Sequence, residues 1–138
     1  RRQRQMCIRD RYNIKYKGEH MIDIEFYDTE EGSCPVQEYL DTLEPKLLAK
    51  TLRTIDLLET NGTKLRMPFS EHIKDGIFEL RAKQSSDITR ILYFFYVGNT
   101  AVLTNGFTKK TRKTPKNQIE LARKYKDDYE RRHKNEQV

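Results

Sequence analysis

The chain has 138 residues, of which 35% are charged, with a net charge of +6 and a mean hydropathy of −0.92. This length accommodates one domain with one core, and the eight tyrosines and six phenylalanines exclude a disordered chain. A membrane-spanning helix is excluded because no apolar run approaches ~20 residues, and Cys7 and Cys34 are too few for a disulfide scaffold or a Cys/His metal site.

The positive charge is unevenly distributed. Residues 1–20 hold seven basic and two acidic residues, residues 21–63 hold three and ten, and residues 64–126 hold fourteen and five. We therefore expect an anionic partner on the half formed by residues 64–126. Residues 1–20 show no apolar periodicity, which predicts a disordered or non-native leader before Met21 rather than a basic arm that grips nucleic acid. The composition is that of a cytoplasmic protein with free thiols.

The first half of the chain predicts one strand and two helices. Residues 21–27 alternate apolar and polar side chains, as a half-buried strand does, and residues 28–32 form a turn. Pro35 opens a helix with apolar residues at helical spacing to Leu43. A second helix begins near Pro45 and ends at Asn61-Gly62. The two helices are expected to form a hairpin that covers a sheet.

The second half predicts three more strands. They cover residues 76–83, 88–97 and 100–107, with a turn at residues 85–87 and a hairpin turn at Gly98-Asn99. The SEHIKD segment before them is expected to be a loop.

A last helix, capped by Thr114 and opened by Pro115, is predicted to extend to about Arg132. The order β-α-α-β-β-β-α, with helices segregated from a mainly antiparallel sheet, predicts an α+β fold.

The densest positive charge lies in TKKTRKTPK, residues 108–116. The run links the last predicted strand to a helix N-terminus, whose free N–H groups also attract phosphate. Such a loop suits a nucleic-acid backbone, because each neutralised phosphate releases counterions. The alternative is an ordinary solvated charge run.

Two arginines, Arg81 and Arg90, lie within apolar strands, where arginine is costly unless it is paired or faces a cleft. Glu79, Arg81 and Lys83 share one strand face. In one interpretation Glu79 simply pairs with Arg81 or Arg90 across strands. The nucleic-acid interpretation is favoured because both arginines and the basic run fall on three consecutive strands and the loop after them.

Such a site suits RNA cleavage by attack of a ribose 2′-OH on its own phosphate, which needs a base, cations and an acid, and no metal or other cofactor. Arg81 and Arg90 suit the phosphate, Glu79 is the candidate base, and Lys109 or Lys110 the candidate acid. Arg90→Ala is then expected to abolish activity without unfolding the domain. The other candidate RNA-binding residues are His72, Lys74, Lys83, Phe107, Thr111, Arg112, Lys113 and Lys116.

Residues 76–124 resemble the core of the phage-derived branch of RelE/HigB-like toxins, in the RelE/ParE superfamily. The shared pattern is G-x-x-E-L-R, then R-x-x-Y-F, then G-F-x-K-K-T-x-K-T-P leading into a helix with a central alanine. Its positions here are Gly76, Glu79, Leu80, Arg81, Arg90, Tyr93, Phe94, Gly106, Phe107, Lys109, Lys110, Thr111, Lys113, Thr114, Pro115 and Ala122. With the helical hairpin, the resemblance covers residues 21–132 and leaves residues 133–138 as a tail.

The resemblance implies a RelE-like fold and a type II toxin that cuts mRNA on the ribosome and is neutralised by an antitoxin, expected to be a helix-turn-helix protein. Arg90, Lys109 and Lys110 match basic positions that these enzymes use. Some relatives carry a lysine where this chain has Glu79, so the identity of the base stays open. The alternatives are a gyrase poison on the same fold and a non-catalytic prophage protein that binds an antitoxin or nucleic acid.

Overall fold

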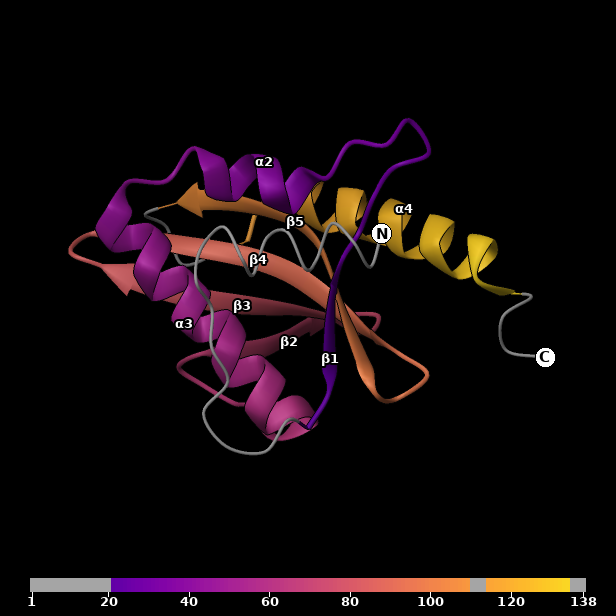
Figure 1. Cartoon of the computed structure of the whole chain (residues 1–138), viewed down its shortest axis with the longest axis horizontal. Coiled ribbons are helices and arrows are strands. Elements are labelled where there is room, and N and C mark those ends of the chain that lie inside the picture. Colours follow the sequence, from indigo (N-terminus) through magenta and orange to yellow (C-terminus); the bar gives the residue numbers. More distant parts are fainter. Residues whose placement is uncertain (1–20, 110–113, 135–138) are drawn as a thin grey trace.

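The computed structural model describes residues 21–109 and 114–134, with the backbone alone at Lys109. The predicted leader, residues 1–20, and the end of the predicted tail, residues 135–138, lie outside this part. The elements are β1 (Asp23–Phe26), α2 (Pro35–Asp41), α3 (Pro45–Asn61), a 3-10 turn (Gly62–Lys64), β2 (Ser70–Lys74), β3 (Ile77–Gln84), β4 (Asp87–Tyr96), β5 (Thr100–Lys109) and α4 (Lys116–Arg132) (Figure 1). The α+β prediction is confirmed. In the described ranges, no helix is long and apolar enough to cross a membrane.

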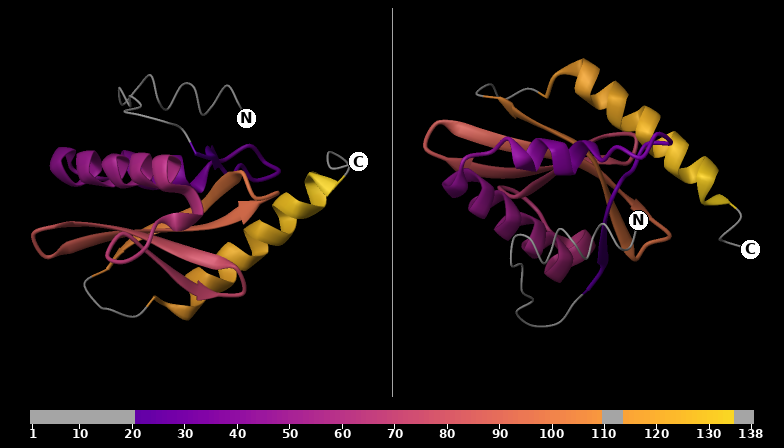
Figure 2. Two further views of the ribbon diagram at one scale, coloured as in Figure 1. Left: turned by 90° about the horizontal axis from the view of Figure 1, so that it is seen from below. Right: turned by 45° about the horizontal axis from the view of Figure 1, so that its top comes forward.

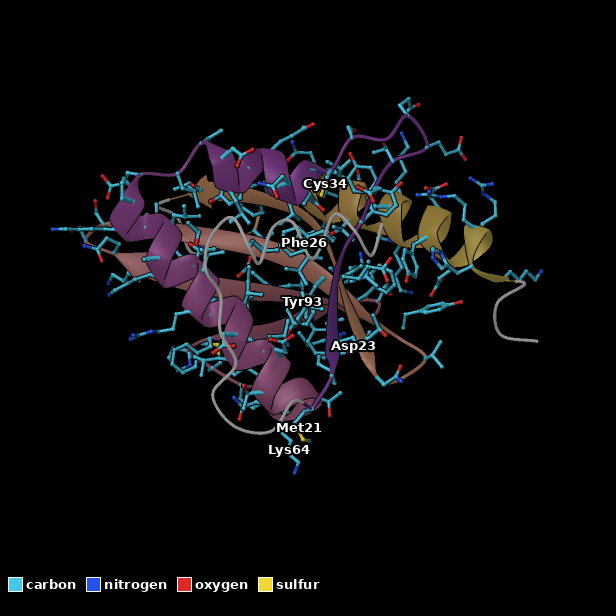
Figure 3. The ribbon with its side chains drawn as sticks, viewed as in Figure 1. Met21, Asp23, Phe26, Cys34, Lys64 and Tyr93 are labelled. Carbon is cyan, nitrogen blue, oxygen red and sulfur yellow. The ribbon has the colours of Figure 1, made fainter. Side chains whose placement is uncertain are left out.

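The sheet has the strand order β1-β5-β4-β3-β2, and β1 with β5 is the parallel pair of an otherwise antiparallel arrangement. Helices α2 and α3 cover one face and α4 crosses the other (Figure 2). Phe26, Cys34 and Tyr93 belong to the core beneath α2 and α3 (Figure 3). On the opposite face, Leu92 and Phe94 are packed with residues of α4 in a second core. The site residues of β3 and β4 therefore divide between two faces according to their parity.

The prediction of a loop at SEHIKD is wrong, because Ser70–Lys74 forms β2, the edge strand beside β3. An edge strand is held by backbone pairing on one side and exposes much of its surface, so it needs little apolar alternation. Ser70 is buried and hydrogen-bonds the Tyr93 hydroxyl, a polar contact that a hydropathy pattern does not reveal.

The proline-initiated helices are confirmed, since α2 begins at Pro35 and α3 at Pro45. The predicted cap of the last helix is wrong. Helix α4 begins at Lys116 after Pro115, and the Thr114 hydroxyl donates a hydrogen bond to the Glu79 carboxylate instead of capping the helix. A buried carboxylate is a strong hydrogen-bond acceptor, so the Thr114 hydroxyl donates to Glu79 of β3 and makes no cap bond to the helix N–H groups.

Gly106 of β5 lies against the ring of Tyr39, whose hydroxyl hydrogen-bonds Thr108 at 2.5 Å. A Cβ at position 106 would stand 2.4 Å from Tyr39 Cδ2. We expect Gly106→Ala to displace the ring and lower the free energy of unfolding by roughly 1–3 kcal/mol, measured by urea denaturation. In a Tyr39→Ala background the same substitution should cost little, and an equal cost in both backgrounds would contradict this cause.

Asp128 anchors the end of α4 to the body of the domain, because it accepts hydrogen bonds from the Tyr27 hydroxyl at 2.5 Å and from Arg132 Nε at 3.0 Å. Burial acts to raise the pKa of Asp128, but these hydrogen bonds outweigh it and hold the pKa below its ordinary value of 3.8. The stabilisation is therefore complete above the unfolded pKa and is lost as pH falls through the folded one.

We expect Asp128→Asn to lower the free energy of unfolding by about 1–2 kcal/mol at pH 7, with the difference from wild type shrinking as pH falls below 3.8. Urea denaturation across this pH range measures the effect. The exposed neighbour variant Asp127→Asn is the control, and a loss that persists unchanged in acid would contradict the ionic cause.

Candidate nucleic-acid interface

The predicted site residues of the three central strands fall into two cross-strand rows. The antiparallel register places Arg81 opposite Arg90, and Arg90 opposite Phe107. Two residues further along β3, in the next row on the same face, the backbone register places Lys83 opposite Ile88, and Ile88 opposite Lys109. We call these the basic rows: Arg81–Arg90–Phe107 and Lys83–Ile88–Lys109. The register thus brings the backbone positions of these residues side by side, and their role in a site stays a prediction.

Glu79 lies two residues before Arg81 on β3, on the face of the sheet that α4 covers, and it is fully buried. It accepts a hydrogen bond from Arg81 Nε at 2.6 Å and one from the Thr114 hydroxyl, and it pairs with Arg90 NH1 at 3.5 Å. The interpretation in which Glu79 pairs with both strand arginines therefore describes the structure. Such a buried carboxylate is tolerable because several donors compensate its charge.

Arg90 is 1% exposed, so its guanidinium lies beneath the surface rather than in an open cleft. Its catalytic role stays a prediction, as does that of Glu79. In this arrangement Glu79 would act through the residue that it holds, and Arg90 through its pairing with Glu79.

That residue is Arg81, whose side chain is 22% exposed. Its Nε binds Glu79, its NH2 binds Glu71 Oε2 at 2.8 Å, and its NH1 lies 3.8 Å from the sulfur of Met67. Two carboxylates therefore fix the guanidinium plane while part of it still faces solvent. Arg81 is the strand arginine that can meet an external phosphate.

Sequence reasoning missed Glu71, whose side chain is 42% exposed and which pairs in register with Glu79. It was missed because β2 was taken for a loop. No hydropathy signal marks this strand, because Ile73 is the one apolar residue of SEHIK, as an edge strand allows.

Two predicted residues lie away from the basic rows. His72 pairs in register with Phe78 and contacts its ring edge, with centroids 5.0 Å apart, on the face opposite Arg81. Its Nε2 accepts the Gly76 N–H at 3.3 Å. Lys74 is exposed at the end of β2 and pairs with Ile77, four residues along β3 from Arg81. The structure does not bring these two side chains to the site.

Comparison with known families decides the relationship. The model of the family described as "Phage derived protein Gp49-like (DUF891)" matches residues 38–127. The chain belongs to this Gp49-like family. The family lies within the RelE/toxin-like group, and the match includes both strand arginines and the whole basic run. No curated protein matches the chain.

In this Gp49-like chain, the basic run is held at both ends beside the site. Lys109 ends β5 at the second basic row, and Thr114 is bonded to Glu79. Lys116 is exposed as the first residue of α4. The predicted residues Lys110, Thr111, Arg112 and Lys113 lie outside the described residues. Because its flanks converge on Glu79 and β5, the run starts and ends next to Arg81 and Arg90.

The aromatic residues of β4 belong mainly to the two cores of the Gp49-like domain. Tyr93 and Phe94 are buried on opposite faces of the sheet, and burial raises the pKa of Tyr93 to about 12. Tyr93 therefore stays protonated at neutral pH. Phe107 is half-buried in the row of Arg81 and Arg90, which leaves it as the aromatic candidate for stacking on a base.

Within residues 21–109 and 114–134, no three His, Cys, Asp or Glu side chains come together as metal ligands would.

Proposed function

We propose that this Gp49-like chain is the toxin of a type II toxin-antitoxin system and cleaves mRNA on the ribosome without a metal. The observation that carries the proposal is the position of Arg81, which Glu79 and Glu71 fix in place while it stays partly exposed. Lys83 is exposed two residues further along β3, and the basic run begins at Lys109 in the same row as Lys83. Membership of a family in the RelE/toxin-like group supports the same reading.

Cleavage by 2′-OH attack places extra negative charge on the phosphate oxygens in the transition state. A preorganised guanidinium stabilises this charge better than a mobile one, because it needs no reorganisation during the reaction. Nε and NH2 of Arg81 are engaged by carboxylates, whereas NH1 has the weak acceptor sulfur of Met67 beside it. The NH1 edge is thus the one that meets the phosphate.

The proton transfers need a carboxylate and an acid near that phosphate. Glu71 is exposed beside Arg81 and is better placed to accept the 2′-OH proton than Glu79, which three groups already engage. Glu79 is then a positioning residue. Lys109 or Lys110 donates a proton to the departing 5′-oxygen, and the rest of the basic run binds the phosphate backbone.

Mapping of mRNA 5′ ends after induced expression tests the proposal. We expect new 5′-hydroxyl ends inside coding regions of ribosome-bound mRNA, and no such ends from an Arg81→Ala variant. Growth should be restored by coexpression of a neutralising partner, for which we propose a helix-turn-helix antitoxin. Intact mRNA together with DNA-damage signalling would overturn the ribonuclease and point to gyrase as the target.

A further inference from the structure

A groove of about 760 Å³ lies between α3 and the last part of β3. Its apolar lining includes Leu57 of α3, Ala82 of β3, and Pro68 and Phe69 from the segment that leads into β2. Phe69 is 41% exposed, although the exposure of an aromatic side chain to water is unfavourable. Its lining residues come from helix α3 and from the β3–β4 hairpin, two elements that can be located in Figure 1. We call this feature the α3–β3 groove.

Among residues 21–109 and 114–134, no strand pairs with the edge of β3 beside the α3–β3 groove. Strand β2 pairs with β3 only from Ile77 to Leu80, and beyond it the Arg81 N–H donates to the Phe69 carbonyl at 2.8 Å. Backbone groups of an antiparallel strand point alternately to its two sides. The carbonyl of Arg81 and both backbone groups of Lys83 therefore point to this edge. An extended chain can pair with such groups.

The rim of the α3–β3 groove is basic. Lys50 and Arg53 of α3 and Lys83 of β3 are exposed cations, and no carboxylate is among the described residues that line the groove. Arg81 also lines it, but that side chain is paired with Glu71 and Glu79. An acidic ligand is favoured by this charge.

We propose that the α3–β3 groove binds an extended acidic peptide segment of a partner protein. The segment adds as a short strand to the edge at Lys83 and places apolar side chains on Leu57 and Phe69. Its carboxylates lie on the same face of the segment as these apolar side chains and meet the rim cations Lys50 and Arg53. Main-chain pairing supplies affinity in such a mode, and alternate side chains supply specificity.

A peptide accounts for the groove better than RNA does. An RNA strand would match the cations, but its charged backbone would cover the aliphatic surface of Leu57 and Ala82. RNA would also leave the backbone N–H and C=O of Lys83 without the regularly spaced hydrogen-bond partners that a peptide backbone offers. The binding does not depend on ribonuclease activity, and its test measures affinity alone.

The test uses the full chain and a fluorescein-labelled peptide in which every second residue is a valine or a glutamate and the residues between them are serine, and it follows binding by fluorescence anisotropy. We expect saturable binding with a dissociation constant of roughly 1–100 µM, since a groove of this size supports modest affinity. Arg53→Glu and Phe69→Ser should each weaken binding by about tenfold or more. Arg123→Glu, which changes an exposed arginine of α4, should not. Circular dichroism verifies that each variant is folded.

Two peptides N-methylated on alternate amides separate edge pairing from simple charge attraction. Methylation of the peptide amides that face β3 should abolish binding, whereas methylation of the amides that face away from β3 should leave the affinity unchanged. The protein is the same in both measurements. Absence of saturable binding, or equal binding of both methylated peptides, would overturn the proposal. It would also be overturned if an oligouridylate bound more tightly than the peptide and lost that affinity in the Arg53→Glu and Phe69→Ser variants.

Discussion

We expect Arg81→Ala to lower the rate of mRNA cleavage by about 10²–10³-fold, the usual cost of removing one preorganised donor to a transition state. The fold should persist, because Glu79 keeps Arg90 and Thr114 as partners and Glu71 is exposed enough to be solvated. The accumulation rate of new 5′-hydroxyl ends on ribosome-bound mRNA measures the effect, and thermal unfolding verifies that the variant is native.

The matched control for this prediction is Arg123→Ala, which removes an arginine of 51% side-chain exposure that pairs with Asp75 at 3.5 Å. It should cleave at the wild-type rate. Arg81→Lys should recover part of the lost activity, because the charge returns without the fork that reaches several oxygens at once. Cleavage at the wild-type rate by Arg81→Ala would show that Arg81 takes no part in the reaction.

Arg90→Ala should lower the free energy of unfolding by about 3–5 kcal/mol, because it takes one cation from a fully buried carboxylate. This expectation reverses the one drawn from the sequence, in which Arg90 faces a cleft and its loss spares the fold. The structural reason is that Arg90 is 1% exposed on the central strand, between Arg81 and Phe107 in the first basic row. Urea denaturation of the purified variant measures the loss.

A double variant separates the ionic cause from loss of packing. Glu79→Gln removes the charge that Arg90 compensates, and Arg90→Met keeps most of the side-chain volume. Together they should be more stable than Arg90→Met alone, because Glu79 then no longer carries a buried charge that has lost one of its cations. If the double variant is as unstable as Arg90→Met alone, the cost does not come from the uncompensated charge.

Much of the candidate site could be predicted from local pattern. Alternation along β3 and β4 indicates that Glu79, Arg81 and Lys83 share a face, and hairpin turns at residues 85–87 and Gly98-Asn99 fix which strands are neighbours. Once neighbours are known, the two basic rows follow from strand geometry. The strand register, however, does not say how deeply the side chains of each row are buried by other elements.

The depth of the site depends on elements far away in the sequence. Helix α4 and Thr114 cover Glu79, whereas Arg81 two residues later lies where this cover ends. Glu71 comes to Arg81 through β2, an edge strand with so little apolar pattern that the sequence predicts a loop. The α3–β3 groove likewise exists because β2 begins at Ser70, opposite Leu80, and does not reach the last part of β3.

The sequence by itself therefore determined the α+β class, the two proline-initiated helices, the three central strands and the polarised charge, because these depend on periodicity and composition within each segment. The tertiary structure alone decided which charges are buried and which meet solvent. Glu79, Arg81 and Arg90 have similar surroundings along the chain, and packing separates them: Glu79 and Arg90 form the buried support, and Arg81 with Glu71 forms the surface that a phosphate can reach.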